Sequence, residues 1–137
     1  MSRHVVAAVE EIPPGGRKIV TVKGREIGVF RLGDSYVALL NRCPHEGAEL
    51  CRGRLVGLAG SAGPGDFRLT RAGEILRCPW HGWEFDLRTG RSICDPDTVL
   101  ARRYTVTVEP GRSLANGTFV AETFPVSVEE EYVVVEV

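Results

Sequence analysis

Two short segments, far apart in the sequence, each place a cysteine and a histidine close together. Cys43 and His45 are separated by one residue, and Cys78 and His81 by two. The chain has only four cysteines and three histidines, so this clustering takes up most of its sulfur and imidazole donors. Thiolates and imidazoles are good ligands for transition metals. The sequence therefore predicts a fold in which two loops bring these four side chains together around a metal centre.

Proline and glycine flank both pairs. Pro44 and Pro79 directly follow the cysteines, and Gly47 and Gly82 follow the histidines within two residues. Proline restricts the backbone and glycine permits turns that strain other residues, so both pairs are predicted to lie in tight loops. A zinc site of two cysteines and two histidines is the main alternative, but zinc sites usually space paired ligands by two to four residues. A domain in which these residues are merely buried is the remaining alternative.

The rest of the chain is predicted to form short strands separated by turns. Alternation of polar and apolar residues over 17–22 and 103–108 is typical of strands, and glycine and proline interrupt the apolar runs. No stretch shows a sustained 3.6-residue apolar period, so little helix is expected. This pattern in 137 residues indicates a single all-β domain, a sandwich or a barrel. Strands are expected over Val5–Val9, Arg17–Val22, Glu26–Leu32, Tyr36–Leu40, Glu74–Leu76, Trp83–Phe85, Arg103–Val108, Phe119–Ala121 and Tyr132–Val137.

Charge and hydropathy exclude several classes of partner. The formal net charge of −1 gives no electrostatic reason to expect a nucleic acid or an anionic membrane. No apolar run reaches 18 residues, and the N-terminus lacks the apolar region of a signal peptide, so a cytoplasmic protein is expected. Thiols stay reduced there. Cys51 and Cys94 are predicted to be small buried residues, since nothing in the sequence supports the geometry of a disulfide between them.

The two segments CPHEGAEL (43–50) and CPWHGWEFD (78–86) resemble the two ligand boxes of the Rieske family. The resemblance covers roughly residues 5 to 137. It implies one [2Fe–2S] cluster, held by Cys43, His45, Cys78 and His81. It also implies one domain, 1–137, with an all-β, antiparallel, sandwich-like fold of three small sheets. The cluster-binding part, about 42–86, would form a tip made of two loops.

Two features depart from the family pattern. His45 and Cys78 are separated by 32 residues, about twice the usual number, and residues 57–73 account for the excess. This Gly- and Ala-rich segment is predicted to be an irregular loop, either a tolerated insertion or an element that selects a partner. Ala48 and Trp80 occupy the positions of an extra disulfide in high-potential members. A serine hydroxyl directly after the second segment is also absent, and hydrogen bonds to the cluster sulfurs raise the potential in the family. A reduction potential near the lower end of the Rieske range of about −150 to +300 mV is therefore expected.

The histidine count limits the activity of the chain. An oxygenase of the Rieske type also needs a mononuclear iron held by two histidines and a carboxylate, and only His4 remains. No nicotinamide or flavin fingerprint is present. The chain is therefore expected to be a one-electron carrier, not an enzyme, that connects a reductase with a terminal oxygenase or similar protein and has no small-molecule substrate. A fixed subunit or redox-sensing module of a larger complex is the alternative. Trp80 and Trp83 are expected to keep water off the cluster, with an electron relay as the alternative.

Overall fold

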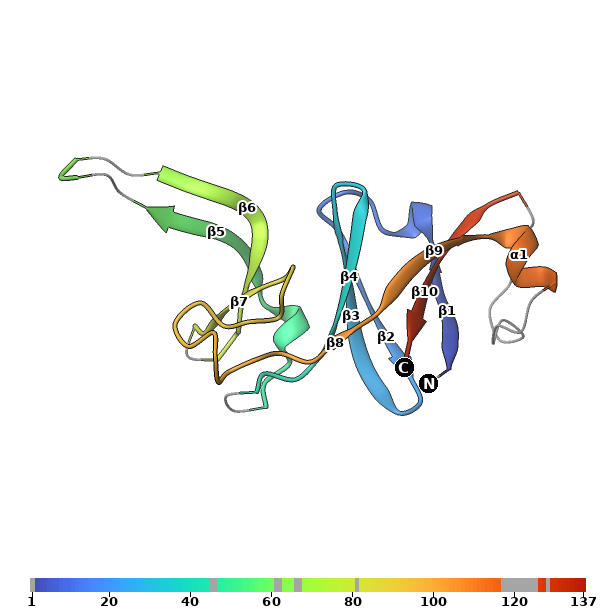
Figure 1. Cartoon of the computed structure of the whole chain (residues 1–137), viewed down its shortest axis with the longest axis horizontal. Coiled ribbons are helices and arrows are strands. Elements are labelled where there is room, and N and C mark those ends of the chain that lie inside the picture. Colours follow the sequence, from blue (N-terminus) through green and yellow to red (C-terminus); the bar gives the residue numbers. More distant parts are fainter. Residues whose placement is uncertain are drawn as a thin grey trace. The chain divides into compact units, whose positions relative to one another are not determined.

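The computed structural model describes residues 2–44, 47–60, 63–65, 68–80, 82–116, 126–127 and 129–137. In this part of the chain the strands form three antiparallel sheets, with one short α helix (Figure 1). Contacts group the chain into two compact units. The first comprises Met1–Ala38 and Arg103–Val137, and the second comprises Leu39–Arg102.

The first unit is built around two sheets. One has the order β1-β10-β9, and the other has the order β2-β3-β4-β8. Four consecutive residues of β10, from Tyr132 to Val135, are buried, so this strand is covered on both faces. The elements are β1 (Arg3–Ala8), the 3-10 turn η1 (Val9–Glu11), β2 (Arg17–Val22), β3 (Arg25–Leu32), β4 (Ser35–Leu40), β8 (Arg103–Tyr104), β9 (Val106–Pro110), α1 (Gly111–Asn116) and β10 (Glu131–Glu136).

The second unit holds the third sheet, with the order β5-β6-β7. Its elements are the 3-10 turn η2 (Leu50–Arg52), β5 (Arg54–Gly60), β6 (Arg68–Arg77) and β7 (Glu84–Asp86). β5 and β6 form a hairpin, and β7 pairs only with the last three residues of β6 (Figure 1). Side chains from all parts of this unit are fully buried in its core, including Leu39, Leu50, Cys51, Ile75, Leu76, Phe85 and Leu87.

The predicted all-β class and low helix content are confirmed, and most predicted strands lie within two residues of the observed ones. The predicted strand Arg103–Val108 is divided at Thr105, because β8 belongs to one sheet and β9 to another. The predicted strand Phe119–Ala121 lies outside the described residues. Among the described residues, no helix has the length and apolar character needed to cross a membrane.

The expectation of an irregular loop over 57–73 is wrong for 57–60 and 68–73. These residues belong to β5 and β6, with Leu58 opposite Thr70 and Gly60 opposite Arg68. Glycine and alanine lower strand propensity, but pairing across the hairpin satisfies their backbone groups and outweighs that local preference. Residues 61–62 and 66–67 lie outside the described part of the chain.

Candidate metal centre

Cys43 lies in a closed turn that follows β4. Its backbone N–H donates to the carbonyl of Ala48 (2.8 Å), and its own carbonyl accepts from the N–H of Gly47 (2.8 Å). Gly47 has φ of 79°, a left-handed conformation that strains residues with a side chain. Cys43 is only 1% exposed, so the turn directs its thiol away from solvent. We call residues 41–51 the first ligand loop.

Asn41 holds the two ends of the first ligand loop together. It is 8% exposed, and its Oδ1 accepts a hydrogen bond from the backbone N–H of Cys51 (2.8 Å). Its Nδ2 donates to Glu49 Oε1 (3.4 Å). The Sγ of Cys51 in turn donates to the carbonyl of Leu39 (3.5 Å). A buried amide that bridges a loop in this way limits the conformations open to the residues between its partners.

Cys78 begins a second loop, residues 78–83, which we call the second ligand loop. β6 and β7 form its stem, with Arg77 opposite Glu84 at the end nearest the loop. The N–H of Cys78 donates to the carbonyl of Trp83 (2.6 Å), which closes the loop. Gly82 has φ of 69°, so the chain turns back at the glycine that the sequence places there. Cys78 is 3% exposed, like its counterpart in the first loop.

The two tryptophans of the second box lie in different environments. Trp80 is 53% exposed, the highest exposure among the large apolar side chains of the described residues, whereas Trp83 is half-buried. An indole that is more than half exposed contributes little to a core, and tryptophan at a protein surface is common in interfaces. The exposure of Trp80 therefore marks the second ligand loop as a surface that another protein can contact.

The predicted ligands His45 and His81 lie outside the described residues. The other two, Cys43 and Cys78, are buried and form no disulfide. The described residues alone contain no group of three or more histidine, cysteine or acidic side chains arranged around a metal. Two buried, unbridged thiols at the ends of closed turns nevertheless fit the need of an iron–sulfur centre for thiolate ligands shielded from water.

The remaining cysteines do not form a disulfide. Cys51 is fully buried, as predicted. Cys94 is exposed, so the prediction that it is buried is wrong. Residue type alone favours burial of a free cysteine, but Cys94 lies in a turn that follows the bridge between Phe85 and Ser92. Sequence reasoning also missed Asn41, since an asparagine without its distant partner carries no recognisable signal.

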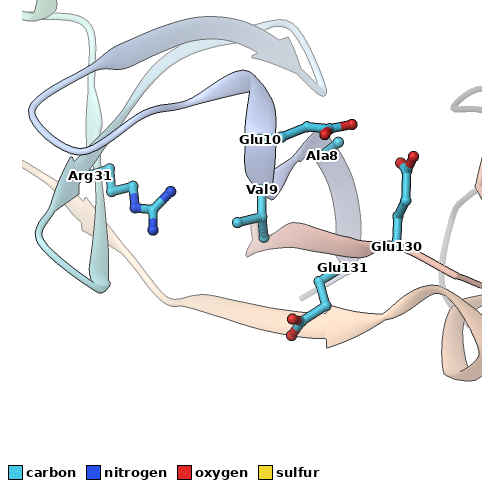
Figure 2. Close-up of a pocket in the computed structure, with 6 residues that line it drawn as sticks. All are labelled: Ala8, Val9, Glu10, Arg31, Glu130 and Glu131. Atoms are coloured by element: carbon cyan, nitrogen blue, oxygen red, sulfur yellow. The ribbon is translucent and has the colours of Figure 1, made fainter.

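A pocket of about 380 Å³ opens on the first unit (Figure 2). It is lined by Ala8, Val9, Glu10, Arg31, Glu130 and Glu131. Arg31 is held in place, because its Nη1 donates to the carbonyl of Ile12 (3.2 Å) and its guanidinium lies over the ring of Tyr36. The pocket offers three carboxylates but no thiol or imidazole. Its chemistry therefore does not match that of the two ligand loops.

Known proteins resemble this chain over most of its length. A family model described as "Rieske [2Fe-2S] domain" matches residues 2–105. The ferredoxin component of the naphthalene 1,2-dioxygenase system of Pseudomonas aeruginosa is 31% identical over 105 residues, which are 77% of this chain and 86% of that protein. The 3-phenylpropionate/cinnamic acid dioxygenase ferredoxin subunit of Photorhabdus laumondii is 32% identical over 111 residues, 81% of this chain and 90% of that protein.

A solved structure is also similar over almost the whole chain. The ferredoxin of carbazole 1,9a-dioxygenase from Nocardioides aromaticivorans IC177 has a TM-score of 0.61 and 28% sequence identity, and the match covers 97% of both chains. The predicted fold class, antiparallel sheets with very little helix, is thereby confirmed from two sides, by the strands themselves and by this likeness.

Proposed function

The chain belongs to the Rieske [2Fe–2S] domain family, and on this premise we propose that Cys43, His45, Cys78 and His81 hold its single cluster. The two cysteines would supply thiolates to one iron, and the two histidines would supply imidazoles to the other. The buried thiols of Cys43 and Cys78 in two closed loops are the observation that carries this assignment. The loops 41–51 and 78–83 then form the predicted two-loop tip of one domain spanning 1–137.

Like its ferredoxin relatives, the chain is an electron carrier and not a complete oxygenase. When bound, the cluster accepts and releases one electron. The residues of the chain hold it between two loops and exclude water from its sulfur ligands. The exposed Trp80 lies in the sequence between the proposed ligands Cys78 and His81, so a partner protein that contacts Trp80 would bind close to the cluster. Electron transfer needs such close approach, so this edge is the proposed exit for the electron.

The proposed partners are a reductase that supplies electrons and a terminal oxygenase, or similar oxidoreductase, that consumes them. Two of the relatives are named as parts of dioxygenase systems, and this chain covers 86% and 90% of their length. The same proposal places the protein in the cytoplasm, and it includes no nucleic-acid, membrane or small-molecule partner.

The alternative function is that of a fixed subunit of an oxygenase complex. Such a subunit would co-elute with its partners in size-exclusion chromatography of a native extract, whereas a shuttle elutes alone.

Reconstitution and EPR spectroscopy test the ligand set. The protein is produced anaerobically with iron and sulfide, reduced, and compared with Cys78→Ser and His81→Cys. The parent should bind two irons per chain and give the EPR signal of one reduced cluster. Cys78→Ser should lose most of its iron, and His81→Cys should change the g values. Cys94→Ser is the matched control, because Cys94 is free and exposed, and should leave both unchanged. A colourless, iron-free parent chain would refute the proposal.

A further inference from the structure

An irregularity in β6 lies just before the second ligand loop. Val56 of β5 is opposite Ile75, but Leu58 is opposite Thr70. Four residues of β6, 71–74, therefore face the single residue Gly57 of β5, which makes a large bulge. A bulge bends its strand, and the bend of β6 is visible where it approaches β7 (Figure 1).

Arg71 begins this bulge in a conformation that arginine rarely adopts. Its φ is 52°, in the left-handed region where glycine is the usual residue. A non-glycine residue there costs about 1 kcal/mol or more and persists only when its surroundings hold it. Glycine would fit this backbone conformation better, so the presence of arginine indicates that its side chain has a role.

The side chain of Arg71 connects the bulge to β7. Its Nη1 and Nη2 donate to the two carboxylate oxygens of Asp86 (3.0 and 2.6 Å), and its Nε donates to Glu74 Oε1 (3.1 Å). The Asp86 side chain is 14% exposed and that of Arg71 33% exposed, so solvent screens this two-point contact only in part. Planar, two-point contacts of this kind fix geometry as well as charge.

Both carboxylates have further partners. The Nε of Arg88 donates to Glu74 Oε1 (2.8 Å), and its backbone N–H donates to Asp86 Oδ1 (2.9 Å). Burial raises the pKa of Asp86, but the hydrogen bonds from Arg71 and Arg88 outweigh it and hold the pKa below its usual value. Both carboxylates therefore stay charged at neutral pH and keep the contact intact.

Asp86 occupies a decisive place in the stem of the second ligand loop. β6 and β7 pair at only three positions, and Asp86 opposite Ile75 is the pair farthest from the loop. Backbone hydrogen bonds add to these pairs, since the N–H of Leu87 donates to the carbonyl of Glu74 (2.9 Å) and the N–H of Asp86 donates to that of Arg91 (2.8 Å). A stem of so few antiparallel pairs still gains from a side-chain contact across it. The contact of Arg71 with Asp86 supports the end of this stem away from the loop, while the bond from Cys78 N–H to the Trp83 carbonyl closes the other end.

We infer that Arg71 is a positioning residue for the second ligand loop, acting through Asp86 and Glu74 to keep Cys78 in place at the end of the β6–β7 stem. The inference rests on the proposed function, because the loop matters only if it holds the cluster. Arg71 touches neither the cluster ligands nor a substrate. Its effect is to keep the β6–β7 stem closed.

Substitution of Arg71 by glycine and by lysine tests this role. Arg71→Gly removes the side chain and also relieves the strained φ, so the backbone itself should gain stability. Arg71→Lys keeps a positive charge but cannot contact both oxygens of Asp86 and Glu74 together. Lys23→Gly is the matched control, because Lys23 also has φ of 52° but lies in the turn between β2 and β3, where its hydrogen bond to Ser2 is exposed.

The first readout is hydrogen exchange of the segment 75–86, measured by mass spectrometry on the loaded protein. Arg71 makes three charge-assisted hydrogen bonds, two of them across the stem to Asp86, so their loss should speed exchange there at least about tenfold. Arg71→Gly and Arg71→Lys should both show this, and Lys23→Gly should match the parent. The second readout is the EPR line shape and midpoint potential, which should change in both Arg71 variants and not in the control.

Two results would overturn the inference. In one, Arg71→Gly exchanges like the parent over 75–86 and keeps its EPR line shape. In the other, Arg71→Lys restores both, which would mean that charge suffices and geometry does not matter. If the parent chain binds no cluster, the proposed function fails, yet the exchange comparison still decides whether Arg71 closes the stem. The two failures are thus distinguishable.

Discussion

Replacement of Gly53 by alanine should disturb the backbone that leads into the second ligand loop. Gly53 follows η2 and precedes β5, with φ of −71° and ψ of 174°, which alanine adopts without strain. A Cβ built there would lie 1.9 Å from the carbonyl oxygen of Arg77 and 3.1 Å from that of Leu50. Ordinary C···O contacts are about 3.3 Å or longer, so the end of β6 would have to move by more than about 1 Å.

The expected cost follows from this displacement. Overpacking of a well-packed site costs about 1–3 kcal/mol, and loss of one hydrogen bond of the Arg54–Arg77 pair adds about 1 kcal/mol. A loss of roughly 2–4 kcal/mol should lower the unfolding temperature of a chain this size by about 10 °C. Because Arg77 directly precedes Cys78, the iron content should fall as well.

Thermal unfolding followed by circular dichroism, together with iron analysis, measures both effects. Gly63→Ala is the matched control, because it lies in the same hairpin segment and a Cβ there meets nothing within 4 Å. The control should be neutral or gain up to about 1 kcal/mol, since alanine restricts the unfolded chain. If Gly53→Ala unfolds within about 1 °C of the parent and keeps its iron, the reasoning is refuted, because the Arg77 carbonyl would then leave room for a Cβ at position 53.

Three further predictions concern single hydrogen bonds and charges. Asn41→Ala should leave the buried N–H of Cys51 without its acceptor and cost about 1–3 kcal/mol in urea unfolding; a shift below 0.5 kcal/mol would contradict the bridging role of the amide. Burial raises the pKa of Asp86, but its hydrogen bonds lower it more strongly, so its pKa in the folded protein lies below the unfolded pKa of 3.8. Asp86 therefore contributes its full stabilisation above pH 3.8, and this contribution is lost as the pH falls through the folded pKa. Acid unfolding should show this loss, and Asp86→Asn should remove that part of the pH dependence. Tyr132→Phe removes the hydroxyl that accepts from the N–H of Ser127 (2.6 Å) and should cost about 1–2 kcal/mol, measured by the unfolding midpoint; no change would mean that water replaces the hydroxyl.

The sequence alone determined the parts of this protein that depend on neighbouring residues. Alternation of polar and apolar residues predicted β2, since successive side chains of a strand point to opposite faces of the sheet. The spacing of cysteine and histidine within each pair, and the glycines after them, predicted two tight loops. Positive φ at Gly47 and Gly82 agrees with that prediction. The ligand set itself, Cys43, His45, Cys78 and His81, remains a prediction.

Only the tertiary structure decided what depends on partners far away in the sequence. Pairing of β5 with β6 made strands of a glycine-rich segment, because hydrogen bonds across a hairpin outweigh weak local propensity. The exposure of Cys94 and the division of the strand at Thr105 likewise depend on which sheet each segment joins. The contact between Arg71 and Asp86 spans 15 residues and needs a bulge to form. No local pattern encodes such a contact, since its geometry exists only once the strands are paired.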